Sequence, residues 1–435
     1  MSDDIRRFFE RMAEEARRSQ PGVPSRMLRR AVRRRVRTVL VLGLAAAVLG
    51  YGGFTGVRAL GPPSRQLPAA PGQCSWTVVP SPNREPDRLD NQLNAVAAFS
   101  DGDVWAVGVS FVNQEGGENF PLTMHWDGTA WTIVPVPDSF GHGNLVDVDG
   151  TSSNDLWAIG LGHDALHWDG SRWSTVPLAD PGTTYWHLEA LSALAPDDVW
   201  AAGNTATGHS GGTLVEHWTG DRWTIVQRGD FPPEPLTGEP EAGLAGIEAR
   251  PGEVWAVGDT ENVAPAETSN TLALHLTQAG WTRTATPDVP AADGKPYSHL
   301  LSVAEVGPDD VWAVGIAASE PGIFGEGDRA LIEHWDGDGW SVAKTLPADS
   351  RLVKVLAVSA DDIWAVGSTG FSGSFGSLVL RWDGTRWEEV PTGITGQAEL
   401  SGISESSSGD LWAVGVSEEN GHGKTLTLRC THGLG

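Results

Sequence analysis

Short runs of consecutive apolar residues recur along most of the chain, and the clearest is Val-Trp-Ala-Val-Gly at Val104–Gly108. Apolar residues at successive strand positions require burial on both faces, because neighbouring side chains point to opposite sides. The tryptophan of this motif returns at intervals of 43 to 57 residues, a period typical of repeat architectures. Its seven copies are Trp105, Trp157, Trp200, Trp255, Trp312, Trp364 and Trp412.

A second motif follows most copies, a Leu-rich segment that ends in His-Trp-Asp-Gly-x-x-Trp, as at His125–Trp131. Arg replaces the His at Arg381–Trp387. A strand of the type Leu93–Ala98 before the first motif, and a Trp-x-x-Val-Pro strand such as Trp131–Pro135 after the second, bring each repeat to four strands. Stacking such units buries both of their faces. The pattern therefore predicts an all-β fold, a seven-bladed β-propeller of four-stranded antiparallel blades over residues 74–435.

The ends of the repeat region predict how the ring closes. The seventh repeat ends at Cys430 without its Trp-x-x-Val-Pro strand, while a spare copy of that strand stands at Trp76–Pro80. We expect the N-terminal strand to complete the last blade, because closure leaves no unpaired edge there. The two cysteines, Cys74 and Cys430, take the places that Thr385 and Trp382 hold in the sixth blade, one hairpin turn apart. This predicts a disulfide in an oxidising compartment.

The order of the motifs resembles the kelch-type propeller blade. In that blade a hydrophobic strand ending in Gly precedes a Tyr-Asp-x-x-Thr-x-x-Trp turn and a strand that ends in Pro. Here the corresponding motifs are Trp-Ala-Val-Gly, His-Trp-Asp-Gly-Thr-x-Trp and Val-Pro-x-Pro, and the resemblance covers roughly Cys74–Cys430. It implies a fold that serves many functions, chiefly binding.

The chain ahead of the repeats predicts a membrane anchor. Residues 1–37 hold 12 arginines against five acidic residues, and an uncharged run of 20 residues follows at 38–57. A helix of that length spans a bilayer, and the preceding arginines favour a cytoplasmic N-terminus. We expect a single-pass protein of the cell membrane, with a Pro-rich linker at 58–73 and the propeller extracytoplasmic. A cleaved signal peptide is the alternative.

The first 20 residues have the i, i+3, i+4, i+7 apolar pattern of an amphipathic helix. Two roles remain open for it: a helix on the inner membrane surface, or a docking helix for a cytoplasmic partner. Its apolar face comprises Ile5, Phe8, Phe9, Met12 and Ala16.

Charge restricts the partners of the propeller. The whole chain has a net charge of −26, but residues 1–37 carry +7, so the remainder carries −33. A body this acidic repels phosphate backbones, and we therefore expect no nucleic-acid partner.

An acidic residue precedes every Val-Trp strand, and antiparallel pairing places it beside the His or Arg of the following strand. Arg cannot bind a metal, so its presence in this series predicts structural carboxylate–donor pairs and no metal site. The chain also lacks nucleophile-elbow, phosphate-loop and His-Glu-x-x-His motifs, and we expect no cofactor. The seven acids are Asp103, Asp155, Asp198, Glu253, Asp310, Asp362 and Asp410.

Candidate binding residues come from the side of the ring where the loops are long and variable. The residue before each innermost strand should surround the mouth of the central channel, and two loops there share a Tyr-x-His-Leu pattern. Their side chains combine apolar faces with polar edges, which suits ligand contact; ordinary solvated loop ends are the alternative. The candidates are Gln92, Asn144, Tyr185, Trp186, His187, Tyr297, His299, Arg351 and Glu399, with Gly243 as the one mouth position that is not polar.

Three classes of function fit these features. The leading hypothesis is an extracytoplasmic binding or scaffold module for a protein or glycan, and the sequence favours this over enzymatic activity without deciding between them. The second is an extracytoplasmic carbohydrate-active hydrolase, against which Glu399 stands as the single acid of the mouth positions. The third is a transmembrane sensor in which residues 1–20 hold a cytoplasmic regulator.

Overall fold

The computed structural model describes residues 74–85, 89–112, 118–141, 143–207, 210–229, 240–262, 268–320, 325–370 and 375–431. Within these ranges the only helix is the short 3₁₀ helix η1 (Asp138–Phe140), and no helix there is long and apolar enough to cross a membrane. The helices predicted within residues 1–20 and 38–57, and the linker at 58–73, lie outside the described residues.

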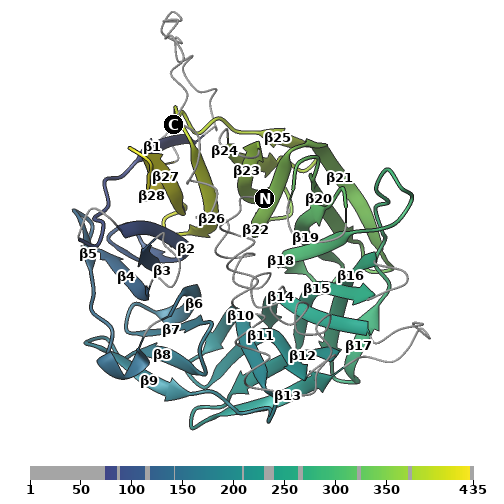
Figure 1. Ribbon diagram of the computed structural model, residues 1–435, viewed down its shortest axis with the longest axis horizontal. Helices are drawn as coiled ribbons and strands as arrows, with labels where there is room; N and C mark the ends of the chain where they lie inside the picture. The colour runs from purple at the N-terminus through teal and green to yellow at the C-terminus, as the bar shows by residue number, and fades with distance from the viewer. Residues whose placement is uncertain are drawn as a thin grey trace, which may run out of the picture.

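Seven blades of four antiparallel strands surround one axis, as the sequence predicts (Figure 1). In each blade the first strand faces the axis and the last lies at the rim. Blades 1 and 2 contain β2 (Leu89–Ser100), β3 (Asp103–Val112), β4 (Asn119–Trp126) and β5 (Trp131–Ile133), then β6 (Leu145–Ser152), β7 (Asp155–Gly160), β8 (Asp164–Trp168) and β9 (Trp173–Pro177). Blades 3 and 4 contain β10 (Tyr185–Ala195), β11 (Asp198–Thr207), β12 (Ser210–Trp218) and β13 (Trp223–Gly229), then β14 (Pro240–Arg250), β15 (Glu253–Asn262), β16 (Thr268–Thr277) and β17 (Gly280–Thr284).

The remaining strands complete the ring. Blades 5 and 6 contain β18 (Ser298–Gly307), β19 (Asp310–Ala317), β20 (Arg329–Trp335) and β21 (Trp340–Ala348), then β22 (Ser350–Ser359), β23 (Asp362–Gly370), β24 (Phe375–Trp382) and β25 (Trp387–Glu389). Blade 7 contains β26 (Ala398–Glu405), β27 (Leu411–Glu419), β28 (His422–Thr431) and β1 (Ser75–Val78).

Tryptophan pairs hold neighbouring blades together. The tryptophan of the second strand of each blade meets, edge to face, the tryptophan that begins the last strand of the next blade. Trp105 and Trp173, for example, have ring centroids 5.6 Å apart and planes at 89°. This geometry is favourable for aromatic rings, and it recurs at every interface. The other six pairs are Trp157–Trp223, Trp200–Trp281, Trp255–Trp340, Trp312–Trp387, Trp364–Trp76 and Trp412–Trp131.

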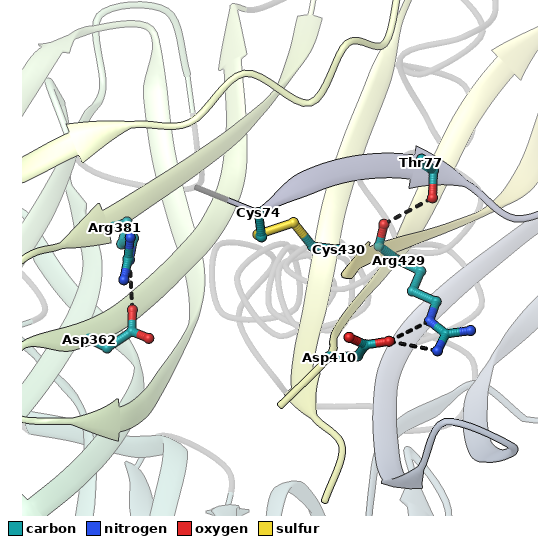
Figure 2. Close-up of a disulfide and its surroundings, with 7 residues drawn as sticks. All are labelled: Cys74, Thr77, Asp362, Arg381, Asp410, Arg429 and Cys430. Atoms are coloured by element: carbon teal, nitrogen blue, oxygen red, sulfur yellow. Dashed lines mark hydrogen bonds and ion pairs between the residues drawn. A yellow bond between two sulfur atoms is a disulfide. The ribbon is translucent and has the colours of Figure 1, made fainter. Parts of the chain in front are cut away.

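The N-terminal strand β1 closes the ring on β28, which confirms the prediction from the spare Trp-x-x-Val-Pro copy. Trp76 lies opposite Cys430 in this pairing and fills the interface with blade 6. Cys74 and Cys430 form the predicted disulfide, with their Cα atoms 5.4 Å apart (Figure 2). The same strand pair is joined by the hydroxyl of Thr77, which donates to the carbonyl oxygen of Arg429 at 3.1 Å. The two ends of the propeller are therefore covalently and non-covalently joined within one blade.

Candidate functional site

The glycine of the Val-Trp-Ala-Val-Gly motif fixes the backbone at the mouth of the ring. A Cβ atom on Gly108 would stand 2.0 Å from the carbonyl oxygen of Gln92, and one on Gly315 would stand 1.9 Å from that of His299. Just beyond this contact every innermost strand contains a β-bulge, which re-aims the strand. Each blade thus presents one residue at an equivalent position. We call this set the mouth ring: Gln92, Asn144, His187, Gly243, His299, Arg351 and Glu399.

Amide groups connect the mouth ring across blades 1 and 2. The side-chain Nε2 of Gln92 donates to Oδ1 of Asn94 at 2.7 Å. The amide nitrogen of Asn94 donates in turn to Oδ1 of Asn144 at 2.7 Å and to the carbonyl oxygen of Leu145 at 2.6 Å. These side chains are buried, so this part of the ring is held by hydrogen bonds between blades.

The two histidines of the mouth ring each lie beside a carboxylate. Nε2 of His187 is 2.8 Å from Oε1 of Glu189, and Nδ1 of His299 is 3.4 Å from Oδ1 of Asp259. Burial lowers the pKa of His299, but the carboxylates of Asp259, Glu261 and Asp328 outweigh it and raise that pKa above its usual value. The carboxylates around His299 therefore favour the protonated form of its imidazole.

An ion pair joins the mouth ring between blades 6 and 7. The guanidinium of Arg351 donates to Oε2 of Glu399 at 2.6 Å and, through Nε, to the hydroxyl of Ser368 at 2.8 Å. The side chain of Glu399 is 7% exposed and that of Arg351 22%. A charged pair in this setting is geometrically specific and costly to break from one side only.

Two of the three aromatic candidates, Trp186 and Tyr297, are buried, whereas the sequence pattern suggested exposed loop positions. Trp186 is 6% exposed and stacks on His163, with centroids 4.5 Å apart. Tyr297 is 1% exposed, and its hydroxyl donates to Oδ2 of Asp293 at 2.8 Å. Trp186 lies on β10 and packs with residues of blades 2 and 3, and Tyr297 packs with Ile316 and Ala318, because burying a large ring gains more than leaving it in water. Tyr185, at 47% exposed, is the solvent-facing member of the group.

Charged side chains farther along the innermost strands meet across the axis, and the sequence analysis missed them. Nζ of Lys354, from blade 6, lies 3.4 Å from Oδ2 of Asp147, from blade 2. Asp147 also accepts the backbone N–H of Leu191, from blade 3, at 2.9 Å. Burial raises the pKa of Asp149 to about 6, and the charge of Asp147 raises it while that of Lys354 lowers it. Burial likewise raises the pKa of Glu248 to about 7. A useful signal was present, because polar residues alternate along the innermost strand at Asp147 and Asp149.

The seven predicted carboxylate–donor pairs are all present at the other end of the blades. His334 lies 2.7 Å from Asp310 and packs on Trp312, and in blade 6 Arg381 takes the same place beside Asp362 at 2.7 Å (Figure 2). These pairs stack on the core tryptophans, which identifies them as parts of the blade framework. The others are His125–Asp103, His167–Asp155, His217–Asp198, His275–Glu253 and Arg429–Asp410. Among the described residues, no group of three His, Cys, Asp or Glu side chains is placed to hold a metal ion.

Comparison with solved structures gives the same architecture. A structure titled "YCF48 bound to D1 peptide" is 15% identical, covers 86% of this chain and 99% of its own, and has a TM-score of 0.51. The chain shares a propeller fold with this protein. A structure titled "Crystal Structure of Mitotic Checkpoint Complex" is 10% identical, covers 88% of this chain and 99% of its own, and has a TM-score of 0.50. A structure titled "Crystal structure of RRP9 WD40 repeats" is also 10% identical, covers 83% of this chain and 99% of its own, and has a TM-score of 0.50. No protein-family model and no curated protein sequence matches the chain.

Proposed function

We propose that this chain is a kelch-like propeller, anchored in the cell membrane by residues 38–57, that binds a protein partner at the mouth ring on the extracytoplasmic side. The observation that carries the proposal is the mouth ring itself. Six blades each place one polar side chain there, and a glycine–carbonyl contact fixes every position. Polar groups on a rigid frame, surrounded by variable loops, are a common basis for recognition.

The buried aromatic rings favour a protein over a glycan as the partner. Sugar-binding sites commonly use exposed aromatic faces, but Trp186 and Tyr297 are packed into cores and leave Tyr185 as the exposed ring of the two loops. The side chains of His187, His299 and Arg351 remain partly exposed at the mouth ring, and these groups suit the backbone and charged side chains of a peptide. The solved propeller whose title names a bound peptide supports the same class of partner.

A capture experiment tests this function. Residues 74–435 would be immobilised and exposed to detergent-solubilised membrane and extracytoplasmic proteins of the source cells, and in parallel to a glycan array. The double variant Arg351→Gln with Glu399→Gln removes both charges from the mouth but keeps groups that can hydrogen bond. Arg172→Ala, at an exposed arginine beside a tight turn, serves as the control. We expect the same protein to be captured by the wild type and the control and lost with the double variant. Equal capture by all three, or selective glycan binding instead, would contradict the proposal.

A further inference from the structure

Two glutamates occupy a blade position that is apolar in the other five blades. The position immediately precedes the His or Arg of the third strand, and it holds Glu216 in blade 3 and Glu333 in blade 5. Both side chains are 0% exposed. An ionised carboxylate is expensive to bury, so each glutamate must gain a partner or stay neutral. The residues at this position in the other blades are Met124, Leu166, Leu274, Leu380 and Leu428.

The surroundings of the two glutamates differ. Oε2 of Glu216 accepts the backbone N–H of Ala179 at 2.9 Å. Neither oxygen of Glu333 accepts a well-aligned hydrogen bond from the described residues. The polar group beside Glu333 is the hydroxyl of Thr271, on β16 of the neighbouring blade 4. Glu333 therefore faces the interface between blades 4 and 5 with the Thr271 hydroxyl beside it but no well-aligned hydrogen bond to either carboxylate oxygen.

The hydrogen bonds at this interface can accommodate one proton on the carboxyl group of Glu333. The hydroxyl of Thr271 donates to the carbonyl oxygen of Pro287 at 3.3 Å, so its own lone pair is available to accept. A protonated Glu333 can donate to that oxygen, and the three groups then form one donor–acceptor series across the interface. An ionised Glu333 has no proton to donate to Thr271, so it cannot complete this series of hydrogen bonds.

The charged groups around Glu333 do not offset a negative charge on it. The charge that acts on it among the described residues is the carboxylate of Asp288, from the segment between β17 and β18, which repels it. On its own strand, the adjacent His334 is engaged with Asp310. Burial raises the pKa of Glu333 from 4.5 to about 8; the Thr271 hydroxyl lowers it and the Asp288 charge raises it further.

We propose that Glu333 is a neutral, proton-carrying link between blades 4 and 5, and that its ionisation weakens this interface. The folded chain binds this proton more tightly than the unfolded chain does. The stabilisation is therefore complete below about pH 4.5 and is lost as the pH rises toward about 8. The same interface holds the contact between His299 and Asp259 at the mouth ring. This consequence rests on the proposed function: where a partner binds the mouth ring, a weaker interface between blades 4 and 5 would disturb the His299 side of that site.

Equilibrium unfolding in urea between pH 5 and pH 9 tests the link on residues 74–435 without any partner. Glu333→Gln keeps a neutral hydrogen-bond donor, Glu333→Leu reproduces the other blades, and Glu389→Gln makes the same chemical change at an exposed carboxylate. We expect the unfolding constant of the wild type and of Glu389→Gln to rise more steeply with pH than that of either Glu333 variant. Between pH 5 and about pH 8 the difference should approach tenfold per pH unit, since one proton is linked, and it should level off above that pH.

Equal slopes in the wild type and Glu333→Gln would overturn the proposal. So would a wild type that sodium or calcium salts stabilise at pH 9 more than they stabilise Glu333→Gln, because a bound cation would then replace the proton. The unfolding measurement does not depend on partner binding. A failed capture experiment together with the expected slopes would reject the proposed function and keep the proton link.

Discussion

Gly315 lies against the carbonyl oxygen of His299, so closely that a Cβ atom on residue 315 would stand 1.9 Å from it. The equivalent contact occurs in all seven blades. It explains why the Val-Trp-Ala-Val motif ends in glycine: the innermost strand can bring its mouth residue to the ring only where its neighbour has no side chain. The repeat motif and the candidate site are thus parts of one local structure.

Gly315→Ala should therefore destabilise the propeller by about 1–3 kcal/mol, because the innermost strand must shift to admit a methyl group. Gly339→Ala is the matched control, since a Cβ there meets no atom within 4 Å and its backbone is not left-handed. Urea unfolding of both variants would measure the difference. Equal stability of the two would show that the close contact does not constrain the fold.

The ring closure predicts equal effects from the two cysteines. Cys74→Ser and Cys430→Ser should each lower the free energy of unfolding, by up to about 5 kcal/mol for a loop this long, and the double variant should cost little more than either alone. A thiol assay on unfolded, unreduced residues 74–435 should detect no free thiol. Two reactive thiols, or additive losses, would contradict the closure.

Adjacent aromatic residues on β10 should respond oppositely to substitution. Trp186→Ala should cost about 3–5 kcal/mol of stability because it empties a packed core, whereas Tyr185→Ala should change stability by about 0.5 kcal/mol or less. Thermal unfolding of the two variants provides the comparison. A stable Trp186→Ala protein would mean that this ring does not support the loop.

The carboxylate–donor pairs should accept either natural donor. His334→Arg should fold with nearly unchanged stability, because Arg381 and Arg429 make the same contact with an acid and pack on the same tryptophan face. His334→Ala should cost about 1–3 kcal/mol by leaving Asp310 without this donor. Denaturant midpoints would distinguish the two. A severe loss in His334→Arg would show that imidazole is required for another reason.

The charges across the axis predict a pH-dependent effect of Lys354. Its ammonium lowers the pKa values of Asp149 and Glu248, which burial raises to about 6 and about 7. In Lys354→Met both values should rise further, so the folded chain must bind these protons more tightly relative to the unfolded chain. The loss of stability should then be small at pH 5 and larger, by about 1–2 kcal/mol, at pH 8. A loss that is the same at both pH values would argue against this coupling.

The repeat motif predicted the fold well because it reports local requirements that recur seven times. Consecutive apolar residues at Val104–Val107 demanded burial on both faces, and the spare strand at Trp76–Pro80 located the closure that β1 makes with β28. The motif glycine also gives the predicted mouth positions an equivalent backbone contact in all seven blades, and their role in binding remains a prediction. The burial of Trp186 was not predictable, because it depends on residues of the neighbouring blade 2, such as His163, that pack against this ring in the assembled structure.

The sequence pattern likewise did not predict contacts between distant blades. Lys354 and Asp147 are 207 residues apart, and the pattern gives no sign that their side chains meet across the axis. The burial of Glu333 could be predicted from its alignment with leucines in other blades, but the groups that surround its carboxyl come from the neighbouring blade. Long-range side-chain partners depend on the assembled ring, which a local pattern does not specify.

Membrane topology follows from the arginines before residue 38 and remains a prediction. A protease added to intact cells should digest the linker at 58–73 and release the propeller, but should spare residues 1–37. Epitope tags at each end would identify the fragments. Protection of the propeller with digestion of residues 1–37 would reverse the assigned orientation.

Photo-crosslinking in living cells tests the central claim most directly, because it records which face of the propeller touches a protein. A photoreactive amino acid would replace the exposed Tyr185, beside the mouth ring, in one strain and the exposed Arg172, at a tight turn, in another. If a protein binds at the mouth ring, we expect a discrete, higher-mass protein adduct from position 185 and none from position 172. Adducts from position 172 alone would contradict binding at the mouth ring.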